Sequence, residues 1–234
     1  MANMFVTKRH IMLGKKSGME MEDFHAHWSG PHVIHVIPVS GAQRYVQCHV
    51  SRILWRSTEQ MAHIAGFVEL DYGTPEALRA VKVSMGNRRA LLEDEANFLG
   101  WWSGSEAESA FGQPFPSQRR AIGILHRPEE EDAAAFRGKV RRFVAEMQAH
   151  CSCYAEEALT REAREYPPLE VFDWPDFYVY CDPARPSELA DVIREDGPFL
   201  TGLKKLTPYG GAFLVRAEAK LMPGEKDAPY WTEG

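Results

Sequence analysis

Two short stretches hold the clearest pattern in this chain: residues 23–32 read DFHAHWSGPH, and residues 44–47 read RYVQ. Within and just after the first stretch, four aromatic and imidazole side chains are spaced by four, four and three residues: Phe24, Trp28, His32 and His35. This spacing places all four on one face of a helix that runs over residues 20–36. The pattern therefore predicts a helix with an aromatic and imidazole face, followed by a strand.

Such a face has two interpretations. The imidazoles are either hydrogen-bonded within a core, or they line an apolar pocket beside a tryptophan, where they titrate near neutral pH. Along the following strand, Tyr45, Gln47 and His49 alternate with their neighbours, so they share one side of the sheet. We expect that side to lie beneath the helix.

The hydrophobic pattern predicts the order β-α-β-β-α-β twice. In the first half, strands are expected at residues 5–13, 42–53, 64–72 and 97–103. Helices are expected at residues 20–36 and 75–81, with a further helical turn at 89–95. Thr74 and Pro75 mark one start as an N-cap and a first-turn proline. In the second half, strands are expected at residues 121–126, 151–159, 176–181 and 209–219, and helices at 129–150 and from Pro186.

Residues 105–119 are rich in Gly, Pro and Ser and are expected to be a linker. The expected domains are residues 1–104, which hold the pocket, and residues 120–234, a degenerate second domain with a C-terminal tail. A four-stranded antiparallel sheet covered by helices on one side leaves its other face bare. We therefore expect an α+β fold in which two ferredoxin-like units of one chain cover each other as an intramolecular α+β barrel.

Composition excludes several classes of protein. The formal charge of −6 and the lack of a basic run argue against nucleic-acid binding. No apolar run approaches the roughly 20 residues that span a membrane. Residues 1–10 lack the apolar block of a secretory signal, so a cytoplasmic location is expected. The four cysteines are too few for a disulfide scaffold, and Cys151 and Cys153 have no second pair with which to bind a metal.

Several pieces of residues 5–103 occur together in a recognisable order. They are KSGM at residues 16–19, Phe24 and Trp28 with His32 beyond them, RYVQ at residues 44–47, and Asp94 followed by Phe98. In this combination the segment resembles the EthD family of the dimeric α+β barrel superfamily. The resemblance implies a ferredoxin-like fold with a pocket between helices and sheet. Relatives include cofactor-free methylisomerases and polyketide-pathway cyclases, dehydratases and decarboxylases, and neighbouring superfamilies bind haem.

The resemblance also implies catalytic residues. His32 corresponds to the family's helix histidine, Tyr45 to its strand tyrosine, and His63 to a histidine near the third strand. Asp94 corresponds to an aspartate before the last strand, where it either orients His32 or caps a helix. Independently of the family, imidazole exchanges protons near pH 7, and a phenol hydroxyl stabilises charge on a substrate oxygen. The alternative is that His32 and Tyr45 only hydrogen-bond within the core.

Other side chains are expected to bind substrate: Phe24, Trp28, His35, Gln47, His49, Phe67 and Phe98. No metal site and no cofactor are expected. His25 and His27 point about 200° apart on a helix, so both are expected to be partly exposed. The helix of the second half has an apolar stripe without titratable residues, which is typical of core.

Together these patterns predict a cofactor-independent lyase or isomerase that acts on a hydrophobic, oxygenated small molecule, aromatic or polyketide-like. One alternative is a haem- or oxygen-dependent enzyme of the same fold, with His32 or His63 as axial ligand. Another is a non-catalytic protein that binds a hydrophobic metabolite. The expected assembly is a monomer with an internal pseudo-dimer, or a homodimer of such chains.

Overall fold

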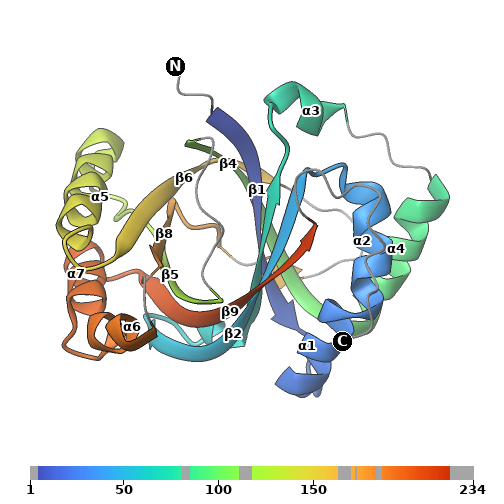
Figure 1. The fold of residues 1–234 in the computed structure, drawn as a ribbon, viewed down its shortest axis with the longest axis horizontal. Coiled ribbons are helices and arrows are strands. Elements are labelled where there is room, and N and C mark those ends of the chain that lie inside the picture. The colour runs from blue at the N-terminus through green and yellow to red at the C-terminus, as the bar shows by residue number, and fades with distance from the viewer. Residues whose placement is uncertain are drawn as a thin grey trace.

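The computed structural model describes residues 5–80, 85–110, 118–162, 170–171, 173–182 and 186–221. A barrel of strands lies at the centre, with α1, α2 and α4 packed on one side and α5, α6 and α7 on the other (Figure 1). None of the helices in these segments is long and apolar enough to cross a membrane.

The first half contains strands β1 (Phe5–Lys15), β2 (Arg44–Arg56), β3 (Ile64–Asp71) and β4 (Leu99–Ala110). Its helices are α1 (Met21–Ser29), α2 (Pro31–Ser40), α3 (Pro75–Arg79) and α4 (Met85–Phe98), with a 3-10 turn at Gln60–His63. The second half contains strands β5 (Arg119–Leu125), β6 (Ser152–Glu162), β7 (Glu170–Val171), β8 (Phe177–Asp182) and β9 (Gly210–Leu221). Its helices are α5 (Ala133–Met147), α6 (Pro186–Ile193) and α7 (Pro198–Leu206).

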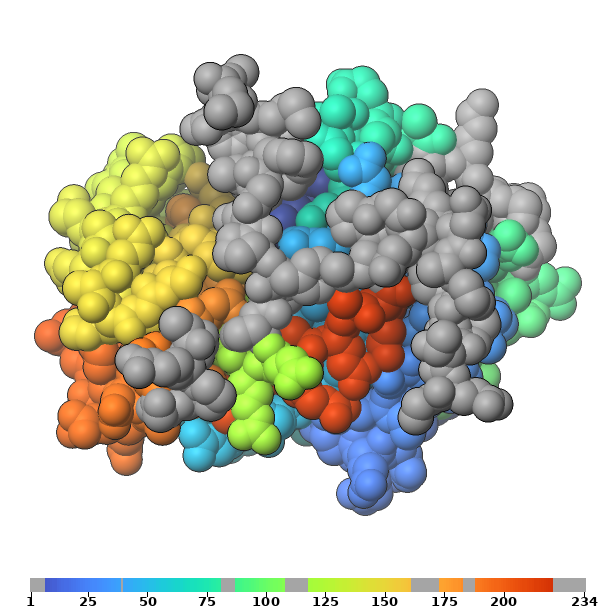
Figure 2. All heavy atoms as spheres, in the orientation of Figure 1, coloured from blue at the N-terminus to red at the C-terminus, as the bar shows by residue number. Residues whose placement is uncertain are grey.

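Each half forms a four-stranded antiparallel sheet with the same order. The first sheet runs β4-β1-β3-β2, and the second runs β9-β5-β8-β6. Edge strands then join the halves, since β2 pairs with β9 and β4 pairs with β6, which closes an antiparallel barrel. Figure 2 shows β9 at the surface between the two halves. The prediction of an intramolecular α+β barrel is confirmed, and the sheets join along their edges as well as across the interior.

Three buried clusters hold the fold together. One lies between the first sheet and its helices, and a second lies between the other sheet and α5, α6 and α7. The third fills the barrel interior with side chains from both halves, such as Met12, Val46, Phe67, Ile122 and Phe213. Burial of these apolar side chains is the main source of stability, at about 25 cal/mol per Å² removed from water.

Charged groups also lie inside the barrel, and they are paired. Lys8 and His10 each lie 2.6 Å from an oxygen of Glu156, and Arg120 pairs with Glu69. All five side chains are at most 2% exposed. Because burial of an isolated charge is costly, these pairs fix which strands of one half meet which strands of the other.

The expected helix over residues 20–36 is two helices. The backbone breaks at Gly30 (φ −107°, ψ −92°), and Pro31 begins α2 because it has no N–H to donate to the preceding turn. The helical turn expected at residues 89–95 is part of a longer helix, because α4 extends over Met85–Phe98. Helix α7 was not predicted, although its buried face of Phe199, Leu200 and Leu203 follows helical spacing.

The expected linker begins inside a strand. Residues 105–110 belong to β4, which pairs with both β1 and β6. Ser103 and Ser105 are fully buried, and the Ser105 hydroxyl lies 3.3 Å from that of Tyr178. The polar composition that resembles a linker therefore belongs to the polar interior of the barrel. Residues 111–117 and 163–169 lie outside the described segments, and residues 170–171 form β7.

Candidate functional site

A carboxylate that joins two imidazoles is the main polar feature between the helices and the first sheet. Asp94 on α4 accepts from Nδ1 of His32 through Oδ2 and from Nε2 of His27 through Oδ1, each at 2.7 Å. Asp94 and His32 are 8% and 4% exposed, and the His27 side chain is 28% exposed. The buried His32 therefore has a fixed orientation, and His27 reaches solvent.

The break at Gly30 makes this arrangement possible. On a straight helix, His27 and His32 would point about 140° apart, since successive residues turn by about 100°. Because α1 ends at Ser29 and α2 begins at Pro31, the two imidazoles can converge on one carboxylate. Of the two interpretations of Asp94, the structure has the one in which it contacts His32.

The electrostatics keep Asp94 ionised. Burial raises the pKa of its carboxyl, but the hydrogen bonds from His32 and His27 outweigh burial and hold the pKa below its usual value. An ionised carboxylate accepts the Nδ1–H of His32 and so selects the tautomer with a lone pair on Nε2. His32 therefore has the tautomer that a general base requires.

Aromatic rings enclose the two imidazoles. The ring of Phe98 lies 4.8 Å, centroid to centroid, from both His32 and His27, and Phe24 lies 5.3 Å from Phe98. Trp28 packs 5.7 Å from Phe24 and passes over Gly66, where an added Cβ would lie 2.3 Å from the indole ring. Only glycine leaves room for the tryptophan at this point of β3.

Tyr45 and Gln47 lie on the helix-facing side of β2, as expected. The Gln47 amide donates to the Tyr45 hydroxyl at 2.7 Å and to the Trp28 carbonyl at 2.8 Å. Tyr45 is 1% exposed, and burial raises its pKa well above the usual value, so the hydroxyl keeps its proton. A neutral phenol in this position is a hydrogen-bond donor to an oxygen anion.

Residues 16–100 match the family model of the EthD domain. The chain is similar to the EthD family over this segment. No curated protein sequence matches the chain. Among solved structures, an anthrone oxidase-like protein has a TM-score of 0.54 at 9% identity, with 96% of each chain covered. A provisionally assigned monooxygenase from Fusobacterium nucleatum has a TM-score of 0.53 at 10% identity, with 94% of this chain and 95% of that chain covered. At these identities the likeness shows a shared fold alone.

The second half contributes one carboxylate to the EthD domain. Glu218 on β9 accepts from the Ser29 hydroxyl at 2.9 Å, and its Oε2 lies 3.6 Å from Nε2 of His49. His49 is buried, with Trp28 and His25 at 4.6 and 4.8 Å between ring centroids. The contact with His49 lowers the pKa of Glu218 far below its usual value, although burial opposes this. Sequence reasoning missed Glu218 because it is far from the EthD segment.

Three other expected site residues are Phe67, His63 and His35. Phe67 points into the barrel interior, where its ring lies 5.3 Å from that of Phe213, so it cannot line a pocket on the helix side. His63 is exposed at the end of the 3-10 turn before β3. His35 is half-buried on α2. His25 and His27 are partly buried, as expected, but the contact of His27 with Asp94 was not predicted.

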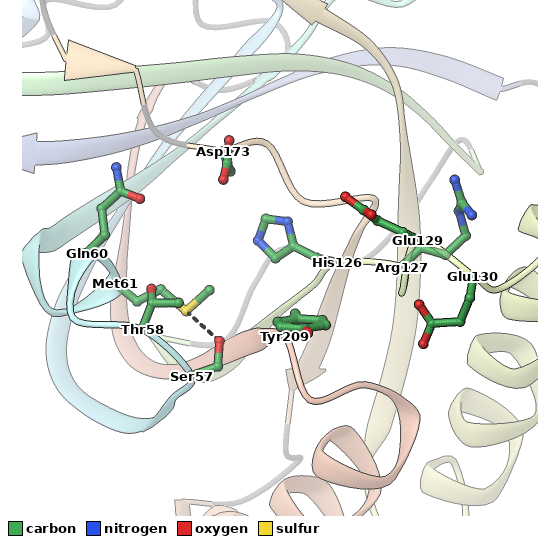
Figure 3. A pocket seen from close by; sticks show the side chains of 10 residues that line it. All are labelled: Ser57, Thr58, Gln60, Met61, His126, Arg127, Glu129, Glu130, Asp173 and Tyr209. Atoms are coloured by element: carbon green, nitrogen blue, oxygen red, sulfur yellow. Dashed lines mark hydrogen bonds between the residues drawn. The ribbon is translucent and has the colours of Figure 1, made fainter.

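A pocket of about 500 Å³ opens at one end of the barrel, and neither His32 nor Asp94 lines it (Figure 3). Its lining combines residues from the β2–β3 connection, from the segment after β5, from before β8 and from before β9: Ser57, Thr58, Gln60, Met61, His126, Arg127, Glu129, Glu130, Asp173 and Tyr209. Only the closed topology brings these residues together, so no local sequence signal could have indicated the pocket. In the part of the chain that the structure describes, no group of three or more His, Cys, Asp or Glu is placed to hold a metal ion.

Proposed function

We propose that this chain is an enzyme that removes a proton from a carbon next to a carbonyl in a hydrophobic, oxygenated small molecule. His32 is the base, and the reaction ends as an isomerisation, a loss of water, a ring closure or a one-carbon loss. The hydrogen bond between Asp94 and Nδ1 of His32 is the observation that supports this proposal. A base oriented by a carboxylate is the usual arrangement for general acid–base catalysis by histidine.

The proposed step needs three groups of the EthD domain. Nε2 of His32 takes the proton, and the Asp94 carboxylate stabilises the imidazolium that results. The electrons left on carbon move to the carbonyl oxygen, which becomes an enolate. The Tyr45 hydroxyl donates a hydrogen bond to that oxygen and stabilises its charge. His32 then returns the proton to another carbon or to a leaving group.

His27 acts through Asp94 in this proposal. Its hydrogen bond to Oδ1 holds the carboxylate in the orientation that His32 requires. The His27 side chain is 28% exposed, so this contact lies on the solvent side of the Asp94 carboxylate. His27 is therefore a positioning residue.

A second candidate function is oxidation by dioxygen. It is favoured by the names of the two structural relatives, an anthrone oxidase-like protein and a provisionally assigned monooxygenase. Removal of a proton from an activated carbon gives the carbanion that dioxygen would attack, so both functions begin with the same step. The visible absorption spectrum of the purified protein, measured with and without added haem, distinguishes a haem-dependent enzyme from a cofactor-free one.

Hydrogen–deuterium exchange tests the shared step directly. The protein is incubated under nitrogen in D₂O with anthrone or another aromatic ketone that has an acidic CH₂ group, and NMR follows the CH₂ signal. We expect faster exchange with the protein than without it, and loss of this acceleration in His32→Ala. Admission of oxygen then distinguishes oxidation from proton transfer alone. Binding of the ketone without accelerated exchange would contradict the proposal and favour a non-catalytic metabolite-binding protein.

A further inference from the structure

Three of the four cysteines gather in the second half of the chain. Cys151 lies between α5 and β6, Cys153 lies on β6, and Cys181 lies on β8 opposite Cys153 in the strand register. The sulfur atoms of Cys151 and Cys181 are 2.9 Å apart. In Figure 1 the strands β6 and β8 lie beside α5 and α7, on the opposite side of the barrel from the EthD helices.

We propose that Cys151 and Cys181 are a peroxide-sensitive thiol pair that closes into a disulfide. Two sulfur atoms at 2.9 Å are closer than an ordinary van der Waals contact, and a disulfide brings them to about 2.05 Å. The pairing of β6 with β8 holds Cys181 and begins at Ser152, the residue after Cys151, so oxidation requires little movement of the backbone. The pair lies outside the EthD segment, and the proposal does not depend on the proposed function.

The thiols of Cys151 and Cys181 differ in their exposure to solvent, and this indicates different roles in the reaction. Cys151 is half-buried and partly open to solvent, whereas Cys181 and Cys153 are 0% and 3% exposed. Hydrogen bonds from the thiols of Cys153 and Cys181 also lower the pKa of Cys151 below its usual value. A thiolate that solvent can reach is the reactive form of cysteine. Cys151 is therefore the thiol that meets the oxidant, and Cys181 is the resolving thiol.

The chemistry uses one molecule of hydrogen peroxide. The Cys151 thiolate attacks a peroxide oxygen, so an S–O bond forms, the O–O bond breaks, and hydroxide leaves and takes a proton to become water. The Cys181 sulfur then attacks the Cys151 sulfenic acid, so the S–S bond forms and the S–O bond breaks. A second water leaves with the Cys181 proton. Two thiols lose two electrons, and the peroxide gains them.

The chain provides two internal controls. Cys48 lies in the barrel interior with no exposed surface, and Arg120 donates to its sulfur at 2.9 Å. Burial raises the pKa of Cys48, so it should react slowly with peroxide. Cys153 neighbours the proposed pair without belonging to it. Cys153→Ser keeps a hydroxyl donor at this position and should leave the pair intact.

Peptide mapping by mass spectrometry tests the proposal on the full-length protein. After treatment with stoichiometric hydrogen peroxide, we expect a peptide pair joined through Cys151 and Cys181, lighter by two hydrogen atoms and separated again by a thiol reductant. Cys153→Ser should form the same cross-link. Cys181→Ser should stop at a Cys151 sulfenic acid, which dimedone traps. A disulfide through Cys153, or oxidation of Cys151 directly to sulfinic acid in the wild-type protein, would overturn the proposal.

A labelling experiment needs no substitution and so does not depend on whether the variants fold. Iodoacetamide is added to the reduced native protein, and the rate of labelling is followed at each cysteine. We expect Cys151 to be labelled at least about tenfold faster than Cys48, because only Cys151 combines exposure with a lowered pKa. Prior treatment with peroxide should protect Cys151 in the native protein, and Cys151 and Cys181 together when the protein is labelled after unfolding in urea. Equal rates at Cys151 and Cys48, or protection of only one of the pair, would contradict the proposal.

Discussion

The ammonium nitrogen of Lys8 lies 2.6 Å from a carboxylate oxygen of Glu156, a residue 148 positions further along the chain. The other oxygen of Glu156 lies 2.6 Å from Nε2 of His10. Lys8 and His10 belong to β1 in the first half, and Glu156 belongs to β6 in the second. Burial alone would raise the pKa of Glu156, but Lys8 and His10 hold it far below its usual value. One carboxylate of the second half therefore contacts both a buried ammonium group and a buried imidazole of the first half.

Glu156→Gln should be strongly destabilising. The amide keeps the size of the side chain but leaves Lys8 and His10 in the barrel interior without an anionic partner. Removal of one partner of a buried ion pair typically costs about 3–5 kcal/mol. Urea denaturation measures this difference, with Glu146→Gln on the exposed side of α5 as the control. A loss equal to that of the control would mean that the interior charges are neutralised in another way.

The ion pair between Glu156 and Lys8 also predicts how the stability of the protein depends on pH. The folded-state pKa of Glu156 is lowered, whereas an unfolded glutamate titrates near pH 4.3. Its contribution is therefore complete above about pH 4.3 and is lost as the pH falls from there toward the folded-state pKa. The difference in stability between the wild-type protein and Glu156→Gln should be largest near pH 6 and smaller at pH 3. Denaturation curves at the two pH values check this, and a constant difference would contradict it.

His32→Ala should lower the rate of proton transfer by roughly 10²-fold or more, the usual effect of a general acid–base group. The imidazole is buried against Phe98 and Asp94, so the melting temperature must be measured alongside the rate. His150→Ala removes an exposed imidazole from the second half and serves as the control. A folded His32→Ala protein with wild-type turnover would leave His32 as core packing.

Asp94→Asn should lower kcat and change the pH profile of the reaction. The amide is nearly the same size, but it is uncharged, and its NH₂ group faces one of the two imidazoles. Without the carboxylate, His32 loses both its fixed tautomer and the stabilisation of its charged form. His27→Gln keeps a donor to Asp94 and should lower kcat far less. Equal effects of the two substitutions would show that Asp94 acts only through the packing of α1 against α4.

Tyr45→Phe separates catalysis from structure. It keeps the buried ring and removes the hydroxyl that accepts from Gln47, so stability should fall by no more than about 1–2 kcal/mol. If the hydroxyl stabilises the enolate, kcat falls while the melting temperature changes little. A large loss of stability with unchanged turnover would assign the hydroxyl to the hydrogen bond with Gln47 alone.

Local patterns in the sequence were enough to predict most of the fold. Thr74 accepts from the Ala77 N–H at the start of α3, as its N-cap position indicates, and the two halves share one strand order. The linker prediction was wrong at its start because Ser103 and Ser105 are polar residues of a barrel interior. A hydrophobic pattern cannot distinguish such a strand from a loop, since the partners that bury these serines lie in the other half.

The candidate site was only partly predicted, because some of its contacts join residues that are far apart in the sequence. His32, Asp94, Tyr45 and Gln47 belong to one family pattern, and the structure brings His32 into contact with Asp94. His27 was missed because its approach to Asp94 depends on the bend at Gly30, whose angle the sequence does not specify. Glu218 was missed because only the pairing of β2 with β9 brings it to His49.

The closed barrel has a consequence for how the sequence of this protein can evolve. In a barrel assembled from two identical subunits, one mutation alters both sides of the assembly at once. Here the two sides are separate stretches of one gene, so Glu156 can differ from its structural counterpart while Lys8 remains as it is. The half that lacks the His32–Asp94 pair can thus have features that the first half does not share, such as the cluster of cysteines that includes Cys151 and Cys181.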